Sequence, residues 1–356
     1  MSQNNSTNVC VDIREELEAE MVDVYFPVIV YLSLFMMFGI IGNVFTFYIY
    51  CYKFEISTTQ MFVVALSVCD LLTCAICIPF DIVLLHHSFT FSSDIVCRLM
   101  VFFVAIVVIS SGFIVFMIAI DRYRLVCRPL EEQISFENSK KILLSLILLS
   151  TFLSSPMLLL HSQGNRLVRQ CGNIGEICSL TKSWQRTVFP FVYYIIGVTS
   201  WLLIFIVLMI LYSLIAIRIA EIDKVKKYRL SQVLKFSSIA SQFDEGEDEE
   251  TPPSIPKFRC VRRHSLHPTQ TNFIFFVITL LWVTSYVPHF ISIFWKLSVE
   301  NFYDTVTQSD QQLSAFLLLS YYPNCAINPY VYGLCNRQFR VELRDLFHNI
   351  RALGRK

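Results

Sequence analysis

The sequence predicts an all-α membrane protein, a seven-transmembrane helix bundle with a short amphipathic eighth helix, and three observations support this. The chain of 356 residues is 54% hydrophobic and only 16% charged, with a mean hydropathy of +0.54. A soluble domain of this size has too little interior to hide so much apolar surface. The apolar residues also gather in seven nearly uncharged runs, and basic residues gather in alternate loops.

Each apolar run is close to or above the ~20 residues that cross ~30 Å of hydrocarbon as a helix. Helices satisfy their backbone polar groups within the segment, as lipid requires, and the runs are too long and too evenly apolar for barrel strands. Asp70 is the only Asp, Glu, Lys or Arg inside them, and His289 is the only titratable residue of the sixth. The seven runs are 24–52, 56–80, 99–120, 142–160, 187–217, 268–295 and 311–336.

Basic residues predict the orientation of the bundle. The loops after the first, third and fifth runs, and the C-terminal segment, are rich in Lys and Arg, whereas the opposite side carries few. The positive-inside rule therefore places the N-terminus outside and the C-terminus in the cytosol, as in a multi-pass plasma-membrane protein. The first residues contain no apolar h-region, so no cleaved signal peptide is expected.

The segment 1–23 is predicted to be an extracellular tail, and its acidic part, 12–23, to be solvated or helical. Asn4 and Asn5 begin overlapping glycosylation sequons. Four cysteines fall on the outer side, where disulfides persist. A bridge from Cys97 to Cys171 or to Cys178 would hold the second outer loop over the bundle, and the remaining cysteine could pair with Cys10. Spacing alone does not choose between these pairings.

Two cytosolic segments complete the predicted layout. Within the predicted seven-transmembrane domain 24–336, the loop 219–267 is polar with an acidic run at 244–250, a composition that cannot form a core and indicates disorder. The segment 337–356 is predicted to be an amphipathic helix on the membrane followed by a short tail. Its apolar side chains recur at helical spacing, and basic residues stand between them. The apolar residues are Phe339, Leu343, Leu346 and Phe347.

A set of motifs occurs in order on the predicted helices. They are Gly42-Asn43; Leu66-Ser67-Val68-Cys69-Asp70; Cys97; Asp121-Arg122-Tyr123; Cys127-Arg128-Pro129-Leu130; Tyr212; Pro288; Asn328-Pro329-Tyr330-Val331-Tyr332; and Phe339-Arg340. With them the chain, from about residue 25 to 348, resembles the rhodopsin-like (class A) G-protein-coupled receptors, and its pattern is similar to that of invertebrate-type peptide receptors.

The resemblance implies a switch at the cytosolic face. In the family, Asp121 holds Arg122 at rest, and the released Arg meets the G protein. A second carboxylate partner on the sixth helix is usual, but Pro268 stands there, so raised basal activity is expected. The further residues of the implied coupling and switch set are Tyr123, Tyr212, Trp282, Tyr286, Pro288, Asn328, Pro329 and Tyr332. Tyr286 stands in place of the usual pivoting Trp, and Pro288 is expected to kink its helix.

Asp70 lies near the membrane centre, where an unpaired carboxylate costs ~2.5–3.5 kcal/mol on insertion scales. The resemblance implies that Asp70, Ser111, Asn324 and Asn328 line a pocket for a sodium ion and waters. Oxygen ligands around a negative charge suit such a hard cation. The alternative is a hydrated polar cluster with no ion. No other cofactor is expected.

Two positions at which receptors of this family carry a ligand-specific residue indicate which ligands this chain does not bind. Val104 replaces the Asp of amine receptors, and Tyr322 replaces the Lys that binds retinal, so neither ligand is expected. Charged groups above an apolar floor suit a peptide, with a lipid or other small molecule as the alternative. The expected ligand-binding residues are Asp81, Val104, Val108, His289, Phe290, Ile293, Lys296, Leu318 and Tyr322, although His289 is equally compatible with a core position.

Together these features predict a receptor that binds an extracellular ligand, with a neuropeptide expected, and activates a heterotrimeric G protein by outward movement of the sixth helix. Arrestin and receptor kinases are further partners implied by the resemblance, and no nucleic acid is expected. No nucleophile–base pair or metal-binding motif indicates an enzyme, and no internal repeat indicates a transporter. The alternative function is an atypical scavenger receptor that does not couple to G proteins.

Overall fold

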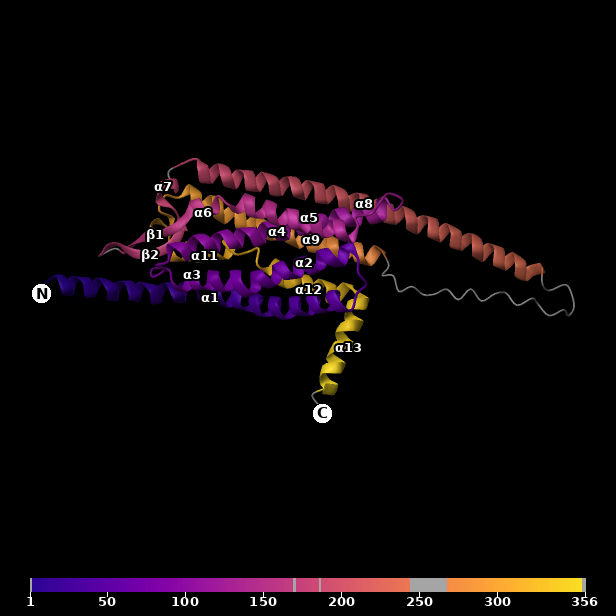
Figure 1. The fold of residues 1–356 in the computed structure, drawn as a ribbon, viewed down its shortest axis with the longest axis horizontal. Helices are drawn as coiled ribbons and strands as arrows, with labels where there is room; N and C mark the ends of the chain where they lie inside the picture. The colour runs from indigo at the N-terminus through magenta and orange to yellow at the C-terminus, as the bar shows by residue number, and fades with distance from the viewer. Residues whose placement is uncertain (1, 169–170, 186, 244–267, 354–356) are drawn as a thin grey trace.

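The computed structural model describes residues 2–168, 171–185, 187–243 and 268–353, and it has the predicted helical bundle (Figure 1). Within those residues, six helical stretches are long and apolar enough to cross a membrane. Five of the spans are built on α1 (Ser2–Tyr52), α4 (Asp94–Cys127), α5 (Phe136–Ser154), α8 (Phe189–Phe243) and α9 (Pro268–Ser298).

The second and seventh spans are interrupted. The second comprises α2 (Thr58–Leu72), a π-helical turn η1 (Thr73–Cys77) and α3 (Ile78–His86). Pro79 has no N–H and would crowd the carbonyl four residues before it, which explains the wide turn here. The seventh comprises α11 (Gln308–Leu318) and α12 (Pro323–Cys335), with the break directly before Pro323. Neither half alone has the length of a full span.

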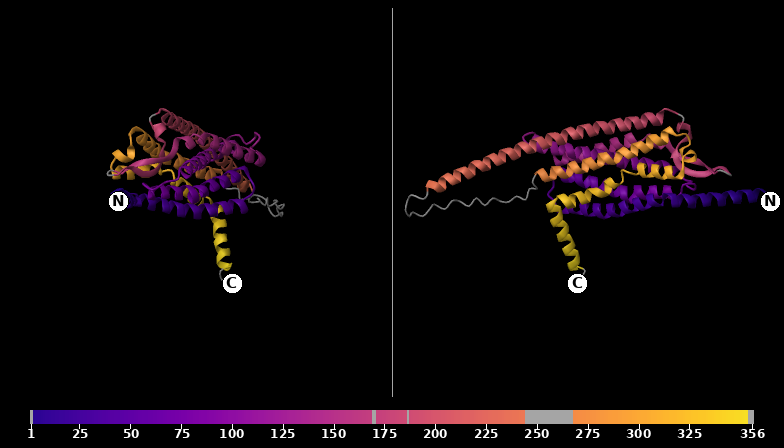
Figure 2. Two further views of the ribbon diagram at one scale, coloured as in Figure 1. Left: turned by 60° about the vertical axis from the view of Figure 1, so that its left-hand side comes forward. Right: turned by 180° about the vertical axis from the view of Figure 1, so that it is seen from behind.

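A β-hairpin covers one end of the bundle. Strand β1 (His161–Val168) pairs antiparallel with β2 (Gly172–Leu180), with His161 opposite Leu180. Three short helices lie in the connecting segments at the same end of the bundle: α6 (Met157–Leu160), α7 (Lys182–Gln185) and α10 (Phe302–Thr305). We call this the hairpin end, and the end from which α13 (Arg337–Leu353) leaves is the α13 end (Figure 2).

The structure settles the cysteine pairing that spacing left open. Cys97 pairs with Cys178, and Cys10 pairs with Cys171, with Cα–Cα distances of 5.5 and 5.7 Å. The acidic part of the predicted tail is the first part of α1, which runs on beyond the bundle (Figure 1). Glu18 accepts hydrogen bonds from the Phe89 amide and the Thr90 hydroxyl, at 2.9 and 3.2 Å, so this segment is docked on the bundle.

One expectation about the long loop is corrected. Residues 219–243 are helical as the continuation of α8, whereas disorder was expected from 219 to 267. That expectation rested on the acidic run 244–250, while 219–243 contain alternating apolar and charged helix-forming residues, and Arg218 pairs with Glu221 one turn on. The acidic run itself lies outside the described residues.

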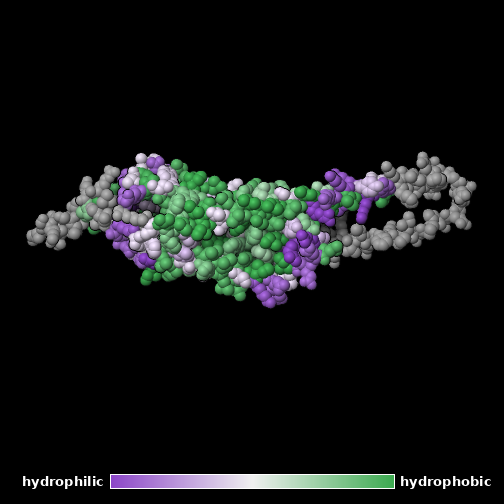
Figure 3. All heavy atoms as spheres, turned by 90° about the horizontal axis from the view of Figure 1, so that it is seen from above, coloured by the Kyte–Doolittle hydropathy of each residue, from purple (hydrophilic) through white to green (hydrophobic). Residues whose placement is uncertain are grey.

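The surface agrees with a membrane protein. On the face drawn in Figure 3, hydrophobic residues cover the middle of the bundle, and hydrophilic residues gather toward both of its ends. Buried side chains from six of the spans form one large core cluster between the helices, and the fourth span adds the partly buried Ile142 and Leu143 against it.

Candidate functional site

The hairpin end contains a large cavity of about 1290 Å³. Four of the expected ligand-binding residues line it, namely Asp81, Ile293, Lys296 and Leu318. The floor is closed by Tyr322, which is fully buried and donates a hydrogen bond to the Asp81 carboxylate. Hairpin residues such as Asn165 and Arg166 also line this cavity, and its wall is polar at several points.

The remaining expected ligand residues lie deeper or in the core. Val108 lines a second, smaller cavity below the first, and Val104 and Phe290 pack against the hydrophobic core. The Nδ1–H of His289 donates to the Leu318 carbonyl at 2.6 Å, and its ring packs edge-on against Tyr321. His289 thus has the satisfied core position that the sequence left as an alternative.

One wall of the large cavity is cationic. Arg166, on β1, is only 5% exposed, and its guanidinium lies 4.1 Å from the Phe89 ring centroid and 5.3 Å from that of Tyr303. Lys296 donates to the Tyr303 hydroxyl at 3.0 Å. Such cation–π contacts contribute about 0.5–2 kcal/mol each, which offsets only part of the cost of burying a charge.

The charges on this wall also act on one another. Burial lowers the pKa of Arg166. Burial raises the pKa of Tyr303, but the positive charge and hydrogen bond of Lys296, with the charge of Arg166, outweigh it, so that the net pKa of Tyr303 is lowered. The Arg166 shift thus reflects burial, and the Tyr303 shift reflects the neighbouring positive charges.

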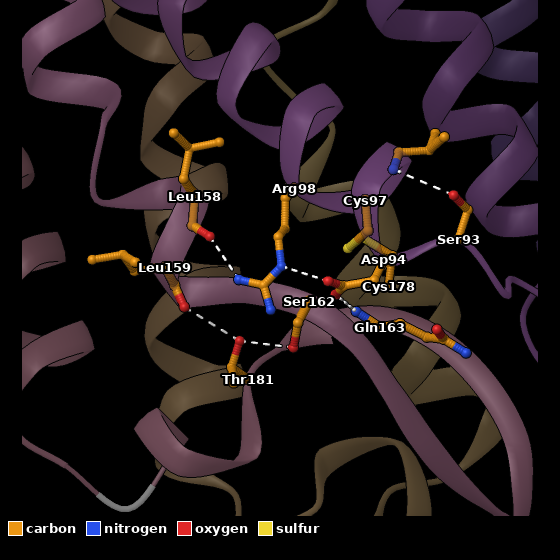
Figure 4. A network of polar contacts seen from close by, with 11 residues as sticks. Ser93, Asp94, Cys97, Arg98, Leu158, Leu159, Ser162, Gln163, Cys178 and Thr181 are labelled. Atoms are coloured by element: carbon orange, nitrogen blue, oxygen red, sulfur yellow. Dashed lines mark hydrogen bonds and ion pairs between the residues drawn. A yellow bond between two sulfur atoms is a disulfide. The ribbon is translucent and has the colours of Figure 1, made fainter.

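The hairpin is anchored at its base by a polar network beside the Cys97–Cys178 disulfide (Figure 4). The Asp94 carboxylate accepts from the Arg98 Nε at 2.8 Å and from the Gln163 amide at 2.9 Å. Arg98 also donates to the Leu158 carbonyl at 2.7 Å. The start of α4 and the start of β1 are therefore held together by a covalent bond and by charge-assisted hydrogen bonds.

The four residues of the implied sodium pocket meet around one central cavity. Asp70, Ser111, Asn324 and Asn328 all line it, and its volume is about 20 Å³. Asn328 donates to the Asp70 carboxylate at 2.8 Å. A cavity of this volume has room for about one water or small ion, and its oxygen donors suit a hard cation. The donor set therefore fits sodium.

The expected switch residues of α9 form the roof of the same central cavity. Trp282 and Tyr286 line it, with ring centroids 5.3 Å apart, and Tyr286 stacks on Tyr321 of the seventh span. The Trp282 indole N–H is buried and has no acceptor among the described residues. A Cβ added at Gly112 would lie 2.7 Å from the Trp282 ring, so only glycine lets α9 approach α4 this closely.

At the α13 end, Arg122 is held from two sides. Its Nη2 donates to the Asp121 carboxylate at 3.0 Å, and the same oxygen accepts from the Thr59 hydroxyl at 2.6 Å. The guanidinium lies 5.5 Å from the ring centroid of Phe275 on α9. The Arg122 side chain is only 13% exposed, so α9 covers it in this conformation.

The tyrosines of the motif set flank this contact. Tyr212 accepts from the Thr279 hydroxyl at 3.1 Å, which links α8 to α9. Tyr332 packs edge-on against Phe275, and its buried hydroxyl has no partner among the described residues. Tyr123 packs on the edge of the core. The α13 end is closed by a layer of aromatic rings around Arg122.

The two prolines of the motif set lie inside helices. Pro288 is in α9, and Pro329 is in α12. A Cβ at Gly42 would lie 2.8 Å from Pro329, so this glycine of the first motif permits the close approach of α1 and α12.

Several residues of the site were absent from the sequence prediction. Phe275, Thr59 and Gly112 carry no motif that singles them out, and Arg166 is not among the expected ligand-binding residues. Other predictions fall where side chains are not described: those on Asn4, Asn5 and Pro268.

Comparisons with known proteins agree with the geometry. The sequence model described as "7 transmembrane receptor (rhodopsin family)" matches residues 42–332. The chain is 22% identical to the cholecystokinin receptor type A of Canis lupus familiaris over 346 residues, 87% of this chain and 77% of the relative. It is 24% identical to that of Cavia porcellus over 366 residues, 88% of this chain and 79% of the relative. The neuropeptide F receptor of Drosophila melanogaster is 23% identical over 318 residues, 87% of this chain and 60% of the relative.

Proposed function

Because this chain belongs to the rhodopsin family of seven-transmembrane receptors, we propose that it binds a peptide at the hairpin end and activates a heterotrimeric G protein at the α13 end. In this proposal the hairpin end faces the cell exterior. Both disulfides lie at that end, as expected for an oxidising compartment. Basic loops and α13 lie at the other end, which supports a cytosolic placement.

The cavity at the hairpin end supports a peptide as the ligand. Its volume, about 1290 Å³, exceeds the 300–1,000 Å³ that is usual for small-molecule pockets. Charged and polar groups lie on the wall, and apolar residues such as Ile293 and Leu318 line its deeper part. Two kinds of relative, receptors for cholecystokinin and for neuropeptide F, are named for peptides.

One observation carries the proposal of G-protein coupling: the Phe275 ring of α9 packs over the Arg122 guanidinium and covers it. The ion-pair partner of Arg122 lies on its own helix, and α9 adds only a cation–π contact. Outward movement of the α13 end of α9 would uncover the guanidinium without breaking a salt bridge between helices. Pro288 interrupts the hydrogen bonds of α9 above this point and provides a place for the movement.

Ligand binding and the displacement of α9 influence one another through their free energies. A ligand that binds more tightly when α9 is displaced shifts the population toward that state. The G protein then tightens ligand binding by the same factor. Trp282 and Tyr286 lie between the large cavity and Phe275 along α9, and their packing is the part of α9 that the ligand would bias.

Sodium is part of the proposal for the closed state. Asp70, Ser111, Asn324 and Asn328 would hold the ion, which would supply a positive charge to balance Asp70. Those residues belong to the second, third and seventh spans, so the ion would favour the packing of those spans. We expect sodium to weaken agonist binding to the wild type and to have no such effect on Asp70→Asn.

The test is a screen of a neuropeptide library on cells that express the chain, reading calcium and cyclic AMP together. We expect at least one peptide to produce a response in the wild type and none in Arg122→Ala, while labelled peptide still binds both. A peptide that is bound and internalised equally by both proteins, without nucleotide exchange, would show the scavenger function instead.

A further inference from the structure

The cationic wall of the large cavity has more positive charge than the chain itself neutralises. Arg166 and Lys296 both face this cavity. Among the described residues, no carboxylate lies within the 4.0 Å of a salt bridge from either group. A guanidinium this deeply buried is normally paired with an anion or used to bind one.

Carboxylates near the cavity act on this pair only from beyond ion-pair distance, namely Asp304 and Glu18 on Arg166 and Asp81 on Lys296. Asp81 accepts the hydrogen bond of Tyr322 on the floor. Asp304 lies in α10 and is exposed, Glu300 has an interaction of its own, and Lys182 is an exposed cation at the rim. His161, also in the lining, is kept neutral because burial lowers its pKa to about 4.

The donors that remain are suitably placed for a carboxylate. Two of the five N–H groups of Arg166 are used, one by the Ser88 carbonyl at 3.3 Å and one by the Gln311 side chain at 2.8 Å. The Phe89 and Tyr303 rings restrict the guanidinium, and Lys296 is bound to the hydroxyl of the same Tyr303. A fixed guanidinium with free donors favours bidentate binding of a planar anion.

We propose that Arg166 and Lys296 form an anion subsite in the large cavity and that the ligand places a carboxylate there. This inference rests on the proposed peptide function and narrows it, because it requires an acidic group on the peptide. The group is either the C-terminal carboxylate or an Asp or Glu side chain.

The experiment uses purified full-length chain in lipid nanodiscs and follows its melting by tryptophan fluorescence. The probes are pools of N-acetylated pentapeptides in three matched forms: free C-terminal acids, the same sequences as C-terminal amides, and amides with one internal Glu. A neutral pool with Gln in place of Glu is the reference. We expect one acidic form to raise the melting temperature and the neutral pools to have no effect. Which acidic form succeeds identifies the source of the carboxylate.

Variants then test the residues. We expect Arg166→Gln and Lys296→Gln each to weaken binding of the active acidic pool at least tenfold. Arg166→Lys should give only partial recovery because it retains the charge but loses the planar fork. Lys224→Gln, at an exposed cation of α8 that does not line the cavity, is the control and should bind like the wild type. The comparison of acid and neutral pools on the wild type needs no variant, so a poorly folding Arg166→Gln leaves the test intact.

The outcomes separate this proposal from the signalling function. Equal effects of acidic and neutral pools, no effect of any acidic pool, or unchanged binding to both Gln variants would overturn the subsite. A neutral peptide that activates the wild type and Arg166→Gln equally would also overturn it while leaving the receptor function in place. Acid-selective binding that depends on Arg166, without nucleotide exchange for any peptide, would support the subsite and remove the signalling proposal.

Discussion

The hairpin end and the α13 end of this bundle are closed by different kinds of contact. At the hairpin end, two disulfides and the Asp94 network fix the loops around an open cavity of about 1290 Å³. At the α13 end, the described contacts around Arg122 are a hydrogen-bonded ion pair within one helix, a cation–π contact with Phe275, and the edge-on packing of Tyr332 against Phe275. The first arrangement keeps its shape, while the second can open at small cost.

The energies explain why this division suits a receptor. A native disulfide is worth about 2–5 kcal/mol, whereas a cation–π contact or a neutral hydrogen bond is worth roughly 0.5–2 kcal/mol. A ligand that distinguishes two states by a few kcal/mol can therefore shift the α13 end without disturbing the hairpin end. Substitutions at the disulfides, at Gly112 and at Phe275 test whether the two ends are as separate as this comparison requires.

The largest effect is expected from the disulfide at the base of the hairpin. Cys97→Ser should lower stability by about 2–5 kcal/mol and sharply reduce the receptor at the cell surface, because the hairpin loses its attachment to α4. Cys10→Ser should cost less, since Glu18 still binds Phe89 and Thr90. Melting temperature in nanodiscs and surface labelling measure both effects.

Cys51 provides the control for that measurement, because it is a free, partly exposed thiol in α1. Cys51→Ser should behave like the wild type. Basal nucleotide exchange per surface receptor should be unchanged in Cys10→Ser. If loss of the Cys10–Cys171 bond raised basal exchange, the two ends would be coupled more tightly than the comparison allows.

An intermediate effect is expected at Gly112, between the two ends. In Gly112→Ala the new Cβ would meet the Trp282 ring at 2.7 Å, so α9 must shift away from α4. Such overpacking costs ~1–3 kcal/mol, more than the ~1 kcal/mol that alanine gains over glycine in helix propensity. We expect a lower melting temperature together with higher basal nucleotide exchange.

Gly197 on α8 is the matched control, because nothing lies within 4 Å of a Cβ added there. Gly197→Ala should leave basal exchange unchanged and keep or slightly raise the melting temperature. If Gly112→Ala had the melting temperature and the basal nucleotide exchange of the wild type, the contact between Trp282 and α4 would not restrain α9.

The sequence predicted the fold well because hydrophobic length decides it. Seven apolar runs specify seven spans, and the break before Pro323 and the turn before Pro79 follow from proline chemistry. The helical course of 219–243 was missed because a composition argument drawn from an acidic run was extended to its neighbours. The disulfide pairing required the hairpin register, which brings Cys178 to α4 and Cys171 to the start of α1.

Sequence reasoning can single out a residue of the candidate site when its type is unusual for its position. It cannot single out a residue whose type is common at that position. Asp70 and Arg122 are conspicuous because a charge in an apolar run needs a reason. Phe275 and Gly112 are common residues in an apolar helix, and only the packing shows that one covers Arg122 and the other admits Trp282. Arg166 was visible as a charge, but its burial between two rings depends on the fold of the hairpin.

The smallest effect, and the sharpest test of the α13 end, is expected from Phe275→Leu. Leucine keeps an apolar side chain on α9 but removes the ring face above Arg122, a loss of about 0.5–1 kcal/mol. That difference corresponds to roughly two- to fivefold higher basal nucleotide exchange, because 1.4 kcal/mol is tenfold.

Phe273→Leu, on the same helix but 57% exposed, is the control and should leave basal nucleotide exchange unchanged. Phe275→Trp keeps a ring face and should restore low basal exchange. Equal basal exchange in Phe275→Leu and the wild type would show that α9 is held at this end by something other than its contact with Arg122, such as the bond between Thr279 and Tyr212.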